Sequence, residues 1–200
     1  MIHIQKLRIV AIDLDSGAKV LKKDFEFDCS HINLLVGDQG CGKSTLLRML
    51  QKNSKGLQLT LADHVLKCGV SSYYFDSEKD NPRVKDPEMY TTPSGEDIGI
   101  GVGGAIGSRF RSHGEIMQSM ILTPISKAKD CVVILDEPES GLSITNQFKL
   151  IKVINAAVKR GCQFFIATHC YPLIEANNVV SLEHWDVMTG GEFIKKVSSK

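Results

Sequence analysis

The feature that most constrains this chain is a glycine-rich loop, residues 37–45, that lies between an apolar run and a helical run. Its sequence fits the pattern G-x-x-x-x-G-K-[ST]. Residues 32–36 predict a buried strand, and residues 45–52 predict the start of a helix. In that order, glycines let successive backbone N–H groups point inward at a helix N-terminus, which is a site for phosphate. A glycine turn without a ligand is the alternative.

The loop carries two side chains with distinct predicted roles. In this motif, called Walker A, Lys43 supplies a positive charge to the β- and γ-phosphates, and Ser44 supplies a hydroxyl for Mg²⁺. We therefore count Lys43 as both nucleotide-binding and catalytic. The predicted nucleotide-binding residues are Gly37, Asp38, Gln39, Gly40, Cys41, Gly42, Lys43, Ser44 and Thr45.

A second motif follows the apolar run 131–135, where a predicted strand ends in Asp136 and Glu137. This fits Walker B: Asp136 would hold Mg²⁺ through water, and Glu137 would act as general base on the attacking water. Pro138 is expected to restrict Glu137 to extended geometry. A buried strand followed by an acidic surface turn is the alternative.

Two further candidates lie at the ends of other elements. His169 follows the predicted strand 163–168, where a histidine can sense a γ-phosphate, although a structural histidine is the alternative. A Ser-x-Gly-Glu turn before the helical run 116–122 predicts a second anion-binding surface, and a capped helix explains it equally well. The residues of that turn are Ser112, His113, Gly114 and Glu115.

The remaining pattern predicts an α/β protein. Runs 4–12 and 20–27 predict an antiparallel hairpin, and 57–61, 70–75, 179–182 and 185–188 predict strands. Helices are predicted over 144–159 and 172–176, followed by a lysine-dotted tail. The glycine-rich stretch 85–107 is expected to be a nucleotide- or partner-responsive loop rather than a linker. The helix over 144–159 should bury a stripe made of Phe148, Ile151, Val153, Ile154 and Val158.

Acidic residues after the strand 70–75 leave two interpretations open. Asp76, Glu78 and Asp80 could reach a magnesium ion or its waters, or could form a solvated turn, which we favour.

Composition excludes some classes. A net charge of +1 gives no global case for nucleic acid or membrane, and no apolar run approaches the roughly 20 residues that cross a bilayer. The start of the chain lacks the apolar region of a signal peptide. Six cysteines without C-x-x-C spacing predict free thiols in a cytoplasmic protein. Cys41, within the loop, is expected to be an inert small residue rather than an oxidation-sensitive one.

Taken together, the motifs resemble an ABC-type ATPase head of the stand-alone and SMC/RecF-like branch, including compact ATPases of bacteria and phages. The likeness covers nearly the whole chain. Walker A is followed in the family's order by a shortened signature (112–115), Walker B, a D-loop position (139–143) and the Thr168-His169 switch. It implies a P-loop NTPase fold: one domain over 1–200, with a mostly parallel core sheet, an N-terminal antiparallel hairpin and a reduced second lobe near 77–125.

The resemblance also implies a mechanism. ATP and Mg²⁺ would be the cofactors, and two heads would pack head to tail, each ATP lying between one P-loop and the other copy's signature. Hydrolysis by Glu137-activated water would open this homodimer. The sequence departs from the family pattern: His113 replaces a glycine of the signature, no clear Q-loop glutamine is present (Asp76 or Glu78 could substitute), and no aromatic is assigned to the base.

Four functions follow from these observations. The first is an ATPase whose dimerisation cycle drives or licenses an unknown protein or nucleic-acid partner, in DNA maintenance or phage–host conflict. The second is a nucleotide-gated switch with little turnover. The third is a transporter ATPase subunit, which Glu139 and the short signature disfavour. The fourth is a small P-loop kinase, which leaves the Ser-x-Gly-Glu turn and Thr168-His169 without a role.

Overall fold

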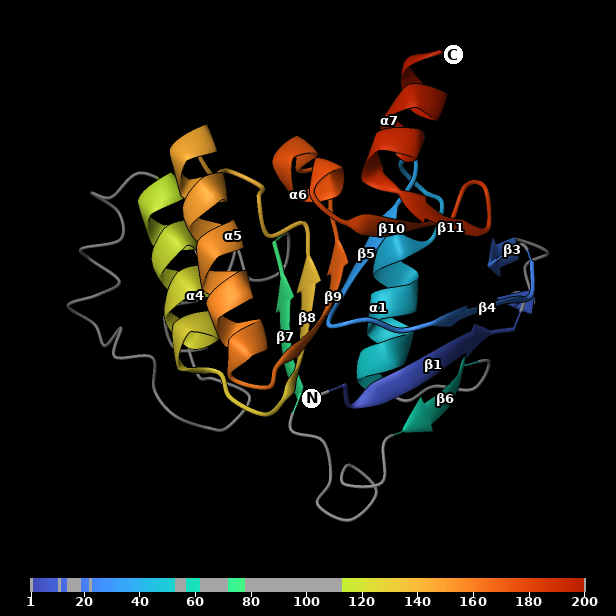
Figure 1. Cartoon of the computed structure of the whole chain (residues 1–200), viewed down its shortest axis with the longest axis horizontal. Helices are drawn as coiled ribbons and strands as arrows, with labels where there is room; N and C mark the ends of the chain where they lie inside the picture. Colours follow the sequence, from blue (N-terminus) through green and yellow to red (C-terminus); the bar gives the residue numbers. More distant parts are fainter. Residues whose placement is uncertain are drawn as a thin grey trace.

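The computed structural model describes residues 2–10, 12–13, 19–21, 23–52, 57–61, 72–77 and 113–199 (Figure 1). The strands are β1 (Ile4–Ile9), β2 (Ile12–Asp13), β3 (Lys19–Leu21), β4 (Phe25–Asp28), β5 (Ile32–Val36), β6 (Leu57–Leu61), β7 (Ser72–Asp76), β8 (Val132–Asp136), β9 (Gln163–Ala167), β10 (Asn178–Ser181) and β11 (Asp186–Thr189). The helices are α1 (Lys43–Lys52), α4 (His113–Lys127), α5 (Ile144–Lys159), α6 (Tyr171–Glu175) and α7 (Gly190–Ser198).

The central sheet has six strands in the order β11-β10-β5-β9-β8-β7. All neighbours pair parallel except β11, which pairs antiparallel with β10 at one edge. Successive side chains face opposite sides: Leu34 and Val36 of β5 join one hydrophobic cluster, and Leu35 joins the other. Because both faces are covered, every residue of β8 and β9 is buried, and these strands are apolar apart from Asp136 at the end of β8 and Gln163 at the start of β9.

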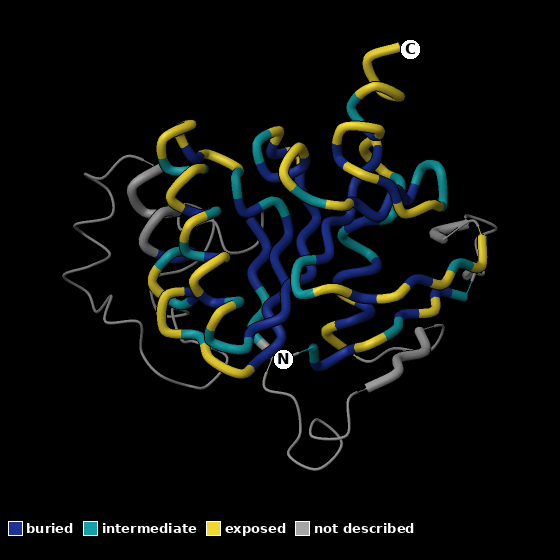
Figure 2. Tube along the Cα trace, viewed as in Figure 1, coloured by how far each residue is buried: buried dark blue, intermediate teal, exposed yellow. Residues whose placement is uncertain are grey.

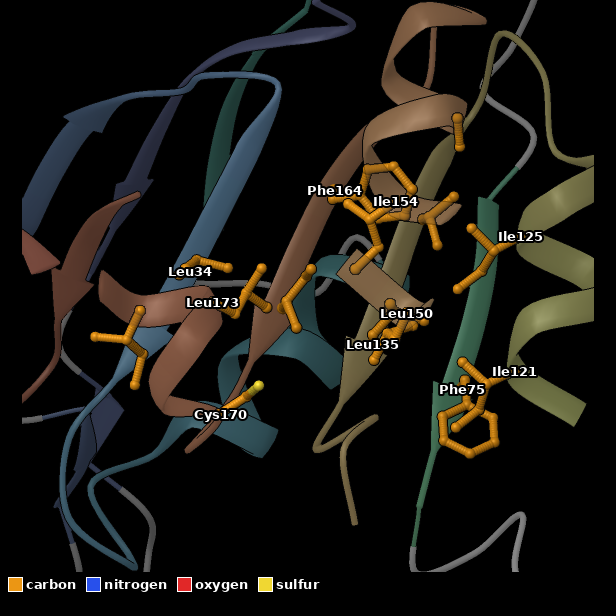
Figure 3. Close-up of a cluster of buried hydrophobic side chains, with 14 of the residues drawn as sticks. Leu34, Phe75, Ile121, Ile125, Leu135, Leu150, Ile154, Phe164, Cys170 and Leu173 are labelled. Atoms are coloured by element: carbon orange, nitrogen blue, oxygen red, sulfur yellow. The ribbon is translucent and has the colours of Figure 1, made fainter. Parts of the chain in front are cut away.

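The central sheet lies between two layers. Helices α4, α5, α6 and α7 contribute to the cluster on one face, where Ile154 of α5 lies beside Phe164 of β9 and Leu150 of α5 lies beside Leu135 of β8 (Figure 3). On the other face, Leu46 and Leu47 of α1 pack with the separate sheet β4-β1-β6. Figure 2 shows the result, with the central strands buried and the outer turns of the helices exposed.

The N-terminal strands form the predicted antiparallel arrangement, with one difference. β1 pairs antiparallel with β4 on one side and β6 on the other, and β2 pairs with β3. The run predicted over 4–12 is two strands rather than one. Gln163 ties this sheet to the core: its buried amide accepts the N–H of His3 (3.0 Å) and Ile4 (2.8 Å) and donates to the carbonyls of Ile4 (2.8 Å) and Ser30 (3.0 Å).

Helix α5 has the predicted bounds, and Ser143 caps its N-terminus. The predicted buried stripe is wrong at Phe148, whose side chain is 50% exposed. The buried positions are Leu150, Ile154 and Ala157, which recur at helical spacing and face the sheet. Phe148 lies two residues, or about 200°, away from Leu150 around the helix and therefore faces outward.

One helix extends beyond its predicted range, and another was not predicted. α4 covers 113–127 rather than 116–122 and contains Pro124. The C-terminal tail is helix α7, which begins with a capping box: Thr189 Oγ1 accepts the N–H of Glu192 (3.2 Å), and Glu192 Oε2 accepts the N–H of Thr189 (2.8 Å). The Thr-x-x-Glu spacing is a sequence signal for a helix start that our reading of the tail missed.

Part of the prediction lies outside the described residues: the stretch 85–107, Glu78, Asp80 and Ser112, and thus most of the predicted lobe near 77–125. Five cysteines within the described ranges are free thiols, as predicted: Cys29, Cys41, Cys131, Cys162 and Cys170. Within those same ranges, no helix combines the length and apolar character needed to cross a bilayer.

The buried face of α5 predicts which substitutions lower the free energy of unfolding. Ile154→Ala removes a fully buried side chain and should lower the free energy of unfolding by about 2–5 kcal/mol. Phe148→Ala is the control, because its side chain is half exposed, and should change it by less than about 1 kcal/mol. Urea denaturation measures both, and equal losses would contradict the register described here.

Candidate functional site

The carboxyl ends of the parallel strands meet at one edge of the central sheet. β5 ends at the phosphate loop, β8 ends at Asp136, and β9 leads into Thr168 and His169. Because β5, β9 and β8 are neighbours, the three sequence motifs become adjacent although more than 120 residues separate the first from the last. This is the edge at which parallel α/β sheets bind ligands.

The phosphate loop has the backbone that its glycines allow. Gly37, Gly40 and Gly42 have φ of 142°, 77° and 101°, a region that other residues rarely adopt. A side chain at Gly37 would also meet Cys41 Sγ, at 2.9 Å from the added Cβ. Cys41 therefore has a packing role, consistent with an inert small residue. Helix α1 begins at Lys43, and its first N–H groups have no intrahelical acceptor, so they face the space that an anion would take.

Lys43 folds back over the loop. Its side chain is almost fully buried, and Nζ donates to the carbonyls of Gly37 (2.8 Å) and Asp38 (3.1 Å). An ammonium has three donors, and backbone carbonyls satisfy its charge less well than phosphate oxygens do. The lysine is thus held within the loop, where a phosphate would meet it.

The two predicted metal-binding residues touch. Ser44 Oγ donates to Asp136 Oδ1 at 3.0 Å, which joins α1 to the end of β8. The pKa of Asp136 is raised to about 6: burial is the largest cause, the carboxylates of Asp76 and Glu137 add to the rise, and the Ser44 hydrogen bond and Arg48 oppose it. A hydroxyl and a carboxylate are hard oxygen ligands of the kind Mg²⁺ takes, and a carboxylate destabilised by burial gains from a cation. The residues present therefore fit a Mg²⁺ ion.

Asp76 corrects the interpretation of the acidic turn after the strand. It is the last residue of β7, is only 4% exposed, and pairs in register with Asp136 on the neighbouring parallel strand. Tyr74 donates to its Oδ2 at 3.4 Å. A solvated turn is therefore wrong for Asp76. The sequence shows an acid at the end of a predicted strand, and the pairing of β7 with β8 places it beside Asp136.

Glu137 and His169 also lie together. Glu137 Oε1 is 3.7 Å from His169 Nε2, and both side chains are partly exposed. Contrary to the expectation from Pro138, Glu137 is not extended: its φ is 48°. Its N–H donates to the carbonyl of Ala167 (2.9 Å), so pairing with the end of β9 outweighs the local preference. The carboxylate thus points from a strained turn toward the histidine.

The predicted signature residues occupy a different part of the same edge. His113, Gly114 and Glu115 form the first turn of α4, and Ser112 lies outside the described residues. α4 packs on α5, and Figure 1 shows its first turn level with the arrowheads of β7 and β8, on the opposite side of the view from α1. The chain does not bring these residues to its own Lys43.

The raised pKa of Asp136 predicts that the free energy of unfolding depends on pH. Its folded pKa of about 6 exceeds the ordinary value of 3.8, so the folded protein holds a proton that the unfolded chain releases between those values. Stability from this group is therefore present below about pH 4 and is lost as pH rises through 6. Asp136→Asn should stabilise the metal-free protein at pH 7.5 by on the order of 1 kcal/mol, after discounting for solvent screening.

Urea denaturation at pH 4 and pH 7.5 tests this, because the stabilisation by Asp136→Asn should vanish at pH 4. The exposed Asp186→Asn variant is the control. A stabilisation that does not depend on pH would contradict the burial of a charged Asp136.

Comparison with solved structures agrees with this geometry. The chain superposes on a bacterial Atm1-family ABC exporter with ATP bound, with a TM-score of 0.58 and 13% identity, over 98% of this chain and 41% of the exporter chain. It also superposes on CbiO1 from Clostridium perfringens, part of the ABC transporter complex CbiONQ, with a TM-score of 0.57 and 15% identity, over 97% and 92% of the two chains.

Neither a protein-family model nor a curated protein matches the sequence. At these identities the structural likeness shows the fold, and the chain spans less than half the length of the exporter. The chain thus has the ABC-type ATPase fold, which confirms the predicted fold class. The predicted SMC/RecF-like branch is not distinguished by this likeness.

Proposed function

We propose that this protein binds ATP with Mg²⁺ at the carboxyl edge of its central sheet and hydrolyses the bond between the β- and γ-phosphates. The observation that carries the proposal is the 3.0 Å contact of Ser44 with Asp136, next to the buried Lys43. A glycine turn without a ligand has no need of a buried lysine, a hydroxyl and a carboxylate gathered from two distant segments. The ABC-type ATPase fold supports the choice of ATP.

Each residue then has a task. Lys43 would exchange its contacts with the Gly37 and Asp38 carbonyls for phosphate oxygens, which are stronger partners for an ammonium. Ser44 and Asp136 would hold Mg²⁺, which neutralises phosphate charge when bound. Glu137 would accept a proton from the attacking water, and His169, 3.7 Å from it, would contact the γ-phosphate. The other residues of 37–45 would line the phosphates.

Dimerisation is the second part of the proposal. Of the predicted signature residues Ser112, His113, Gly114 and Glu115, the last three form the first turn of α4, which lies away from the chain's own phosphate loop (Figure 1), and Ser112 is outside the described residues. A second copy, packed head to tail, would bring them to the nucleotide. ATP would then close a homodimer, and loss of the γ-phosphate would release the contacts that favour the closed state.

The biological setting rests on the resemblance alone. We place the chain, as a single domain over 1–200, with the stand-alone and SMC/RecF-like heads in the cytoplasm. Its cycle would drive or license a protein or nucleic-acid partner, in DNA maintenance or phage–host conflict. A transporter ATPase subunit is the second candidate, favoured by the names of the two similar structures, and co-purification with a membrane subunit would support it.

Phosphate release from the purified protein tests the central proposal. We expect steady release from ATP that requires Mg²⁺ and falls when EDTA is added. ATP binding without measurable release, even when partners are supplied, would favour the nucleotide-gated switch. Failure to bind any nucleoside triphosphate at millimolar concentration would contradict the proposal.

A further inference from the structure

A carboxylate outside the predicted catalytic set connects two loops of the site. Glu139 follows β8, and its Oε1 accepts the backbone N–H of His169, which follows β9. Its other oxygen, Oε2, is buried and has no hydrogen-bond partner among the described residues. Glu139 has no part in the proposed hydrolysis itself.

Glu139 is itself firmly held. Its carbonyl accepts the N–H of Leu142 (2.9 Å), and the N–H of Ser140 donates to the Glu137 carbonyl (3.0 Å). These turns lead directly into α5, whose N-terminus Ser143 caps. The carboxylate therefore projects from a rigid turn, and its bond to His169 transfers that rigidity to the next loop.

The hydrogen bond between Glu139 and the His169 N–H affects how the side chains of Glu137 and His169 lie relative to each other. The side chains of Glu137 and His169 are 40% and 48% exposed, so packing alone does not restrict them. Glu137 is already joined to the end of β9 through the Ala167 carbonyl. Glu139 supplies a second connection, two residues further along each segment, and together the two connections determine how the histidine faces the glutamate.

Retaining a carboxylate here has a cost. Burial raises the pKa of Glu139 above its ordinary value, while hydrogen bonds from the His169 N–H, from its own backbone N–H and from the Thr168 side chain oppose that rise. A buried oxygen without a partner also lowers stability, by about 1–3 kcal/mol in general. These few hydrogen bonds offset little of the cost of burying the carboxylate, which favours a functional reason for the residue.

We infer that Glu139 is a positioning residue, which holds the loop carrying His169 so that the imidazole faces Glu137. This inference rests on the proposed ATP hydrolysis. The feature that matters is a hydrogen-bond acceptor at Oε1, and a displacement of about 1 Å in such a site can lower a rate by as much as 100-fold.

The experiment compares Glu139→Gln, which keeps the acceptor, with Glu139→Ala, which removes it. In Glu139→Ala we expect the His169 amide to lose its protection from hydrogen exchange and kcat to fall about 10–100-fold, with KM within about 3-fold because Lys43 is untouched. Glu139→Gln should keep the protection and a kcat within about 3-fold of wild type. Glu192→Ala is the matched control, because Glu192 also accepts a backbone N–H but at α7.

The outcomes separate the inference from the proposed function. A His169 amide that stays protected in Glu139→Ala, or a kcat that does not change, overturns the positioning role. An equal loss of kcat in the Gln and Ala variants also overturns it, because charge rather than the acceptor would then matter. If wild type hydrolyses no ATP, the proposed function fails, and the amide exchange alone still shows whether Glu139 holds the loop.

Discussion

Glu137→Gln is expected to lower steady-state phosphate release by a factor of about 100 to 10,000, the usual contribution of a general base, while ATP binding persists. Glutamine fills the same space at the 48° φ turn but accepts no proton. The lost function is therefore proton transfer rather than structure. Phosphate release under saturating Mg-ATP measures the rate, and equilibrium dialysis measures the binding.

The same variant tests dimerisation. With hydrolysis blocked, ATP should remain in place, and the closed homodimer should accumulate. We expect light scattering to give twice the monomer mass with Mg-ATP and the monomer mass without nucleotide. Glu175→Gln, an exposed glutamate at the end of α6, is the control and should behave as wild type. A Glu137→Gln protein that stays monomeric under saturating Mg-ATP would contradict the head-to-tail dimer, and an unchanged rate would remove Glu137 from the mechanism.

Lys43→Ala is expected to weaken ATP binding by at least about 100-fold, because two or more charge-assisted hydrogen bonds at about 1.5–3 kcal/mol each are lost. In wild type, ATP at 100 times its dissociation constant should add about 2.7 kcal/mol to the free energy of unfolding, and the variant should lose most of this gain. Thermal unfolding with and without Mg-ATP measures the difference.

Lys52→Ala is the matched control for that experiment. Lys52 ends the same helix α1 but is exposed and lies at the far end from the phosphate loop. It should keep the stabilisation by ATP. If both variants keep it, the loop at 37–45 is not the nucleotide site, and the proposed function loses its basis.

The local motifs could be predicted because each is encoded by neighbouring residues. The loop at 37–45 needs glycines at the positions whose φ is positive, and β5 and α1 follow from apolar runs beside it. Helix α5 has the bounds that its apolar periodicity predicts, because that periodicity is a local signal. The fold class followed from these elements in order.

The predictions for Phe148, Glu137 and Asp76 were wrong because interactions between distant segments decide how these residues lie. Phe148 is as apolar as Leu150, and only the packing of α5 on the sheet decides which of the two is buried. Glu137 leaves the extended geometry that Pro138 favours, because the end of β9 accepts its N–H. Asp76 is buried rather than solvated, because β7 pairs with β8.

By itself, the sequence determined a phosphate loop, an acidic strand end and a histidine after a strand, each readable from its own neighbours. Only the tertiary structure decided that Ser44 touches Asp136, that Asp76 lies beside it, and that Glu139 holds the His169 loop. The physical reason is strand order. A motif depends on adjacent residues, whereas the contacts of a site depend on which strands pair and in what register, and that is settled by burying both faces of the sheet together.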